Sequence, residues 1–146
     1  MTMRFPLALA LALTAAPAFA GPASDAVQFF YSNIGAEFDP ANGGRFVDPA
    51  KSVFEAAAKS EEPCLDFGVA LDAQDYDEAQ VAKTLKLVEE VNGDQAMVTA
   101  SFSLFEGDAQ NDREIVWELK QIGGQWRIAD IGQANGAWKL SEFACE

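Results

Sequence analysis

The sequence predicts an α+β fold in which N-terminal helices pack on a four-stranded antiparallel sheet. Three observations predict it. Apolar residues recur at helical spacing in the first half of the chain, they alternate with period two from Lys83 onward, and turn-forming residues separate the alternating segments. Helices followed by a strand meander are typical of α+β domains, and the alternation leaves one apolar sheet face for the helices to cover.

Two helices are predicted before the sheet. The first covers residues 25–34, and its apolar side chains fall at the i, i+3, i+4 and i+7 positions of one helix face: Val27, Phe30, Tyr31 and Ile34. Residues 36–47 are rich in Gly, Asn and Pro and indicate a loop. Asp48 is then placed as an N-cap with Pro49 at the first helical position, so that a second helix runs to about Glu62.

Four strands follow. They are predicted over residues 84–91, 96–105, 114–122 and 125–131, and the last strand contains the sequence QWRIADI. The first two strands are joined by Asn92-Gly93-Asp94, a hairpin sequence, because Asn and Gly tolerate the positive φ of a tight turn. A short terminal segment over residues 138–144 is expected to carry Cys145 back toward Cys64.

The first 20 residues resemble a secretory signal peptide. Arg4 precedes a Leu- and Ala-rich run, and Ala18 and Ala20 supply small residues for cleavage near Ala20. The apolar run is shorter than a membrane-spanning helix. We therefore predict a single domain over residues 21–146 that lies in the periplasm or is secreted, without a membrane anchor.

The composition is strongly acidic. The whole chain has a formal charge of −13, with 10 basic against 23 acidic residues; without Arg4 the exported part would stand at −14. Binding to nucleic acid or to an anionic membrane depends on clustered cations, so this balance argues against both. It favours a basic partner by long-range attraction, or it serves only solubility.

The two cysteines predict a disulfide. Cys64 and Cys145 are the only cysteines in the chain, and an oxidising compartment lets such a pair form and persist. The competing interpretation, a reactive thiol, requires a neighbouring base or a lowered pKa. The chain has no His, and the acids that follow Cys64 would raise the pKa of its thiol.

Short motifs along the chain resemble a family of exported bacterial proteins known as domain of unknown function 3828. They are AVQFFYSNIG in the first helix, AQDYDEAQV before the sheet, VNGDQAMVTASF at the hairpin, and GGQWRIADIG followed by WKLSEF at the end. The family belongs to the nuclear transport factor 2-like superfamily. The resemblance implies a curved sheet wrapped around helices as a cone, with a pocket between helix and sheet, and it implies no activity.

The acidic stretch CLDFGVALDAQDYDEAQ, residues 64–80, does not match a standard calcium-binding loop. Neither Asp72 nor Asp75 as the first ligand places Gly and a bidentate acid at the required positions. Sites for zinc or copper favour His or thiolate ligands, which argues against them as well. We predict no metal and no cofactor, with an irregular calcium site on these oxygen ligands as the alternative. We expect the later acids of this stretch to line a solvated turn or to cap a short helical turn.

Asp66 and Asp130 are the candidate pocket acids. Alternation from Trp126 through Ile128 places Asp130 on the apolar face of the last strand, where it would act as a general base or accept a hydrogen bond at the strand end. Asp66 is either a pocket acid, a solvated loop acid or a helix cap. Serine and cysteine nucleophiles activated by His are excluded because the chain has no His.

The remaining candidates for a pocket are aromatic. Tyr31 on the first helix and Trp117 on the third strand would line the cavity if the cone is hollow, whereas a filled cone would make both of them core residues. The candidate ligand-binding set is therefore Tyr31, Asp66, Trp117 and Asp130, and no catalytic residue is assigned.

The sequence thus predicts a non-catalytic exported module that binds a small apolar ligand or interacts with another protein. The first alternative is an acidic interaction or inhibitor protein for a basic partner. The second is an enzyme that uses a pocket Asp as general base. Nothing in the sequence determines the oligomeric state.

Overall fold

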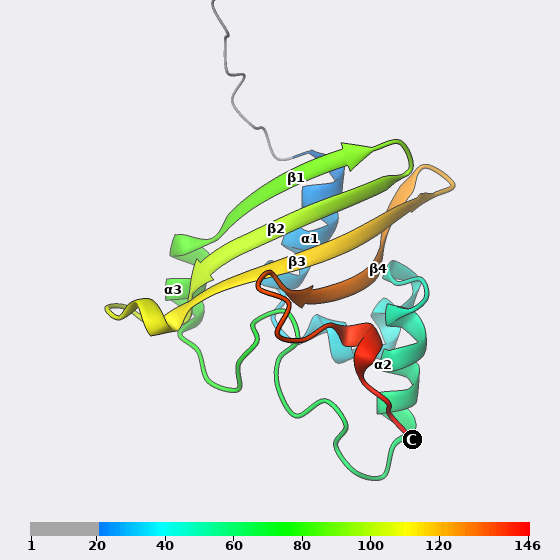
Figure 1. Cartoon of the computed structure of the whole chain (residues 1–146), viewed down its shortest axis with the longest axis horizontal. Coiled ribbons are helices and arrows are strands. Elements are labelled where there is room, and N and C mark those ends of the chain that lie inside the picture. Colours follow the sequence, from blue (N-terminus) through cyan, green and yellow to red (C-terminus); the bar gives the residue numbers. More distant parts are fainter. Residues whose placement is uncertain (1–20) are drawn as a thin grey trace, which may run out of the picture.

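The computed structural model describes residues 21–146, so the predicted leader lies outside the described residues. The described part contains three α-helices and one four-stranded sheet (Figure 1). The α+β prediction is confirmed. Within residues 21–146, no helix combines the length and apolar character needed to cross a membrane.

The sheet is an antiparallel meander in sequence order. Its strands are β1 (Lys86–Asn92), β2 (Gln95–Ser103), β3 (Asp112–Ile122) and β4 (Gln125–Gln133), so β1 and β4 are the two edge strands. The predicted turn joins β1 to β2, and Gly93 takes the positive φ of 64° that the hairpin requires. The predicted strands therefore lie within about two residues of the observed ones.

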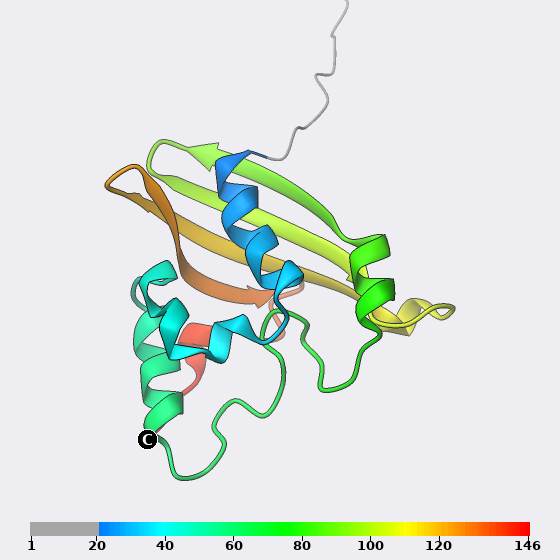
Figure 2. The same ribbon diagram turned by 180° about the vertical axis from the view of Figure 1, so that it is seen from behind.

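Helix α1 (Pro22–Ser32) lies across one face of the sheet. It is behind the strands in Figure 1 and in front of them in Figure 2. It begins three residues before the predicted start. The backbone N–H of Ser24, in its first turn, donates to the carboxylate of Glu89 on β1 at 2.8 Å. A negative charge at a helix N-terminus is stabilising, and here it comes from a strand side chain, because Gly21 at the N-cap offers no side-chain hydrogen bond.

Helix α2 (Ala50–Lys59) packs against β4 and is three residues shorter than predicted at its C-terminal end. The Asp48 carboxylate accepts hydrogen bonds from the Ser52 N–H at 3.2 Å and from the Ser52 hydroxyl at 2.5 Å. The segment between α1 and α2, predicted as loop, forms two 3₁₀ helices, η1 (Ala36–Phe38) and η2 (Pro40–Arg45).

A third helix, α3 (Glu78–Thr84), lies at the end of the sheet near the start of β1. The side chain of Asp77 accepts a hydrogen bond from the Gln80 N–H at 3.0 Å and caps this helix. One member of the acidic stretch thus has the helix-capping role that the sequence offered as an alternative to a solvated turn.

A β-bulge in β4 reverses the predicted orientation of Asp130. Leu119 pairs with Ile128, whereas the neighbouring Glu118 pairs with Asp130, which leaves Ala129 as the extra residue. Asp130 therefore lies on the face opposite to Ile128. The prediction that both share the apolar face was wrong, because one inserted residue shifts the alternation of every position after it.

The C-terminal segment returns along β4, with a bridge between Gly132 and Lys139 and a final 3₁₀ helix, η4 (Leu140–Glu142). Beyond it, Cys145 forms the predicted disulfide with Cys64, with a Cα–Cα distance of 5.4 Å and a separation of 81 residues along the chain. The disulfide joins the connection between α2 and α3 to the C-terminal segment.

Candidate functional site

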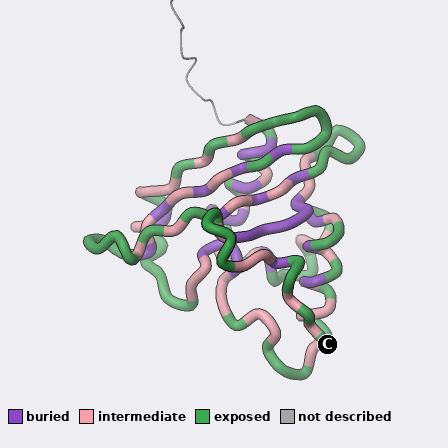
Figure 3. Tube along the Cα trace, viewed as in Figure 1, coloured by how far each residue is buried: buried purple, intermediate pink, exposed green. Residues whose placement is uncertain are grey.

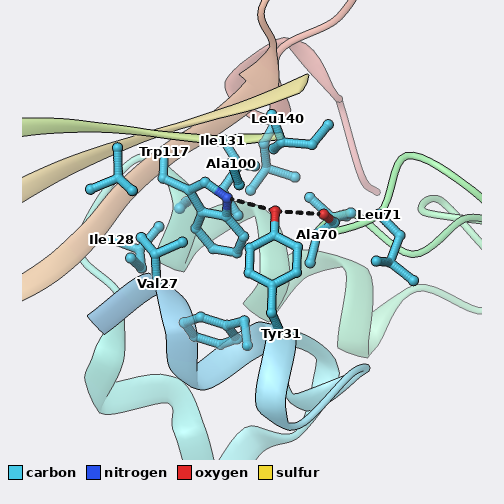
Figure 4. Packing of buried hydrophobic residues seen from close by; sticks show 14 of the residues in the cluster. Val27, Tyr31, Ala70, Leu71, Ala100, Trp117, Ile128, Ile131 and Leu140 are labelled. Carbon is cyan, nitrogen blue, oxygen red and sulfur yellow. Dashed lines mark hydrogen bonds between the residues drawn. The ribbon is translucent and has the colours of Figure 1, made fainter. Parts of the chain in front are cut away.

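The space between α1 and the sheet is filled by side chains. Tyr31 and Trp117 are both buried there, and their rings meet at 5.9 Å between centroids (Figure 4). The Trp117 indole N–H donates to the Tyr31 hydroxyl at 3.1 Å, and that hydroxyl donates to the Ala70 carbonyl at 2.9 Å. Phe30 stacks on Trp117 at 5.2 Å. The polar side-chain atoms of Tyr31 and Trp117 thus all have hydrogen-bond partners within the core.

This packing decides the role of the two aromatic candidates. Five open surface grooves on the described part of the chain have neither Tyr31 nor Trp117 in their lining. Burial also raises the pKa of the Tyr31 phenol, so the hydroxyl stays protonated and acts as a hydrogen-bond donor. Tyr31 and Trp117 are the centre of a solid core, and they give no support to a small-ligand cavity at this place.

Asp130 is buried on β4, and its carboxylate binds backbone N–H groups. Its carboxylate accepts hydrogen bonds from the N–H groups of Ile131 at 3.0 Å and Ser141 at 3.1 Å. The Lys139 ammonium lies 3.5 Å from Asp130 and 2.8 Å from Glu118, and hydrogen bonding to Glu118 raises its pKa. Asp130 thus ties the C-terminal segment to β4.

Asp66 is exposed and lies apart from the other three candidates. Its backbone carbonyl accepts from the Gln74 side chain at 2.8 Å, and its side chain borders a shallow groove beside Phe38. The structure therefore brings Tyr31 and Trp117 into contact, places Asp130 on the opposite side of the sheet, and leaves Asp66 on a surface loop.

One buried acid was absent from the sequence prediction. Glu37, on η1, is only 2% exposed and accepts a hydrogen bond from the Ala70 N–H at 3.3 Å. Its second oxygen, Oε2, has no hydrogen-bond partner among residues 21–146. Burial raises the pKa of this carboxyl group, because desolvation outweighs the backbone hydrogen bonds that favour its charged form. Its hydrogen-bond partners in the described part of the chain are backbone N–H groups, and no basic side chain is among them.

Neither a free thiol nor an imidazole is available for nucleophilic chemistry in this chain. Both cysteines are consumed by the disulfide, and the sequence supplies no His as a base. Across residues 21–146, no three acidic or cysteine side chains converge in a way that would hold a metal ion.

The open face of the sheet is the candidate binding surface. It is the face seen in Figure 1, where no helix lies over β1, β2 and β3, and Figure 3 shows its exposed strand positions. The register places Val88, Thr99 and Val116 side by side across three strands, and Met97 lies next to this row. Val88 is 52% and Met97 45% exposed. Apolar side chains thus occupy sheet positions that face water.

Two grooves lie on either side of this row, one toward each end of the strands. The larger, of about 800 Å³, includes Lys86, Ser101 and Glu114; the other, at the hairpin end, includes Glu90, Met97 and Glu118. Both are open and shallow, and their walls mix charged and apolar side chains. Grooves of this kind are better suited to contact with another protein than to binding a small molecule, because a small molecule needs an enclosed and mainly apolar cavity.

One feature of the sequence indicates this open face and was not used in the prediction: apolar residues at strand positions that face water. Val88, Met97 and Val116 stand in the water-facing phase of their strands, where an antiparallel sheet with one solvated face normally carries polar side chains. Where apolar residues in the water-facing phase of neighbouring strands gather into a patch, they are a feature of interaction surfaces.

No model of a known protein family matches the chain. No curated protein matches it either. Among solved structures, the fold is shared with one chain of the type VI native effector-immunity complex Tae3-Tai3 from Ralstonia pickettii. That chain has a TM-score of 0.55 and 20% identity, and the match covers 80% of this chain and 97% of the other. The selenomethionine form of the same complex gives a TM-score of 0.54 and 21% identity, covering 78% and 97%.

Proposed function

We propose that this chain is a protein-binding module of immunity type, which binds and neutralises a protein effector outside the cytoplasm. The observation that carries the proposal is the open face of the sheet, where Val88, Met97, Thr99 and Val116 form an uncovered and partly apolar surface on a solid core. The shared fold with a chain of an effector-immunity complex supports the same proposal.

The chemistry of the chain agrees with binding rather than catalysis. Of the candidate acids, Asp130 accepts hydrogen bonds from backbone N–H groups and Asp66 faces water. The aromatic candidates, Tyr31 and Trp117, fill the core. A fold held by a disulfide and a packed core provides a rigid surface, which lowers the entropy lost on association. This supports the acidic interaction protein predicted from the sequence over a ligand-binding pocket.

We assign the protein to the periplasm in this proposal. The leader-like residues 1–20 and the Cys64–Cys145 disulfide both support an exported protein in an oxidising compartment. The assignment to the nuclear transport factor 2-like superfamily, and within it to domain of unknown function 3828, stays a prediction of the sequence.

The test is capture followed by protection. Oxidised, tagged protein is incubated with envelope extract and culture supernatant, and retained proteins are examined by gel filtration for a complex of defined stoichiometry. The matched variant is Val88→Lys combined with Val116→Lys, which places charges on the open face and leaves the inner face intact. We expect the complex with the wild-type chain and not with the variant.

The second step tests immunity. The retained protein is directed to the periplasm of a bacterial host, where we expect it to arrest growth, and coexpression of this chain is expected to restore growth. A retained protein that is harmless, or growth arrest that persists during coexpression, would contradict the immunity function.

A further inference from the structure

The end of the sheet beside α3 carries two exposed aromatic side chains. Tyr76 is 38% exposed and precedes α3, and Phe105 is 39% exposed and follows β2. A backbone hydrogen bond from the Asp77 N–H to the Leu104 carbonyl, at 2.8 Å, joins the two segments next to these residues. We call residues 75–78 and 104–112 the tip. Figure 1 shows the connection between β2 and β3 projecting beyond the rest of the sheet.

The tip is held in place by its own hydrogen bonds. The Leu104 N–H donates to the Asn111 carbonyl at 2.8 Å, and the Asp108 side chain accepts from the Gln110 N–H at 3.2 Å. At its base, the Ser103 hydroxyl is bonded to Asp112, and the Thr84 hydroxyl accepts from the Ser103 N–H at 2.9 Å. A projection ordered in this way presents its aromatic side chains without a large loss of loop entropy on binding.

The charge around the two aromatic residues has one sign. Exposed carboxylates stand on both segments of the tip: Asp75, Asp77, Glu78, Glu106, Asp108 and Asp112. Arg113 lies at the base of the tip, and its guanidinium hydrogen-bonds within the chain. It donates to the backbone carbonyls of Asp72 at 3.2 Å and of Gln110 and Asp112 at 2.9 Å. Lys83, in the last turn of α3, and Lys86, at the start of β1, line the larger groove of the open face.

The size of the open face leaves room for a contact beyond it. The three strands have seven, nine and eleven residues, so at about 3.3 Å per residue and about 4.8 Å per strand they give a face of about 30 by 14 Å. Its projected area of about 430 Å² is about half of the roughly 800 Å² per partner that a stable interface buries. The larger groove, which includes Ser103 and Asp112, connects this face with the base of the tip.

We infer that the tip is the second contact of the partner, that Tyr76 and Phe105 anchor it, and that the partner surface facing them is basic. The inference rests on the proposed protein-binding function and adds the chemistry of the partner. Aromatic side chains are enriched among the residues that dominate protein interfaces. The surrounding carboxylates attract a cationic surface and orient it before contact.

The experiment compares two tip variants in the capture assay described above. The first is Tyr76→Ser with Phe105→Ser. The second is Asp75→Asn with Glu78→Gln and Glu106→Gln, three acids that have no side-chain hydrogen bond within the described residues. Circular dichroism and the melting temperature establish that each variant is folded.

Each variant has a matched control. For the aromatic pair the control is Val91→Ser, at an exposed apolar residue at the hairpin end of the sheet that pairs with the buried Ala96 and so does not belong to the open face. For the acids it is Glu61→Gln with Glu62→Gln and Glu142→Gln, three exposed carboxylates near the disulfide. The dissociation constant of the retained protein is measured for all four variants at 50 and 300 mM NaCl.

We expect each tip variant to weaken binding at least about tenfold, and each control less than about twofold. Binding to the wild-type chain should weaken as salt rises, and the acid variant should lose most of this dependence. The retained protein should be basic. A complex that survives both tip variants, or an acidic partner, overturns the inference and leaves the proposed function standing. If the wild-type chain retains no protein, both fail.

Discussion

The two faces of the sheet differ more than any other two regions of this molecule. On the inner face Ala100, Val98 and Trp117 are completely buried, whereas on the open face Thr99 and Val116, their neighbours in the same strands, are only half-buried. Successive residues of one strand point to opposite faces of the sheet. The inward-facing side chains form the core that stabilises the fold, and the outward-facing ones are available for contact with a partner.

The largest expected effect is at the centre of the inner face. Trp117→Ala should lower the free energy of unfolding by about 3 to 5 kcal/mol, because it removes a fully buried ring and leaves the Tyr31 hydroxyl without its donor. The matched change on the open face, Val116→Ala, should cost less than about 1 kcal/mol. Urea unfolding monitored by circular dichroism measures both. Similar losses for the two variants would contradict the division of the sheet into a stabilising and a binding face.

Removal of the disulfide should cause the second largest loss of stability. Replacing Cys64 and Cys145 by Ser together should lower the free energy of unfolding by about 2 to 5 kcal/mol, because the covalent loop of 81 residues no longer restricts the unfolded chain. The same unfolding measurement on oxidised wild-type protein is the reference. A variant as stable as the wild type would mean that contacts of the C-terminal segment with β4 suffice to hold it.

A smaller defect on the inner face is made by Tyr31→Phe. The ring stays in place, but the Trp117 indole N–H and the Ala70 carbonyl both lose their partner in a dry core. We expect a loss of about 1 to 3 kcal/mol in the free energy of unfolding. The control is Tyr76→Phe, which removes an exposed hydroxyl and should leave stability unchanged. Equal effects of the two substitutions would indicate that water reaches the Tyr31 hydroxyl.

The last prediction compares acids on the two sides of the sheet. Because burial raises the pKa of Glu37 in the folded state, this group contributes stability that is present below its unfolded pKa of about 4.5. That contribution is lost as the pH rises through the folded pKa. Glu37→Gln should therefore be more stable than the wild type at pH 7, and the gain should shrink toward pH 4.

The exposed Glu90 on the open face provides the control for this pair of pH values. Glu90→Gln should change stability by less than about 0.5 kcal/mol at either pH. The measurement is the urea midpoint of each variant minus that of the wild type, which cancels the titration of the other carboxylates. A gain from Glu37→Gln that does not depend on pH would show that Glu37 titrates normally in the folded protein.

Local patterns were enough to predict most of the architecture. The helical spacing of Val27, Phe30 and Tyr31, the hairpin at Asn92-Gly93 and the alternation along β2 each determine a structure over a few residues, and all three were found where predicted. The disulfide was predictable for a different reason, since two cysteines allow a single intramolecular pairing.

What failed depended on distant parts of the chain. The bulge at Ala129 inverts Asp130 by pairing β4 against β3, which no property of β4 alone indicates. Glu37 lies in a segment that looks like a polar loop, and only its packing against Ala70 makes it a buried acid. Whether Tyr31 and Trp117 enclose a cavity or fill one is likewise decided by the side chains from other elements that meet them.

The position of the disulfide also sets the order of events during maturation. The four strands and α3 all lie between Cys64 and Cys145, and 81 residues separate the two thiols. Disulfide formation takes seconds to hours, whereas a hairpin forms within microseconds, so β1 and β2 can pair before the bond closes. The covalent bond therefore seals a sheet that has already begun to assemble, and refolding of the reduced chain with its thiols blocked should give a chain with strands formed and its ends unlinked.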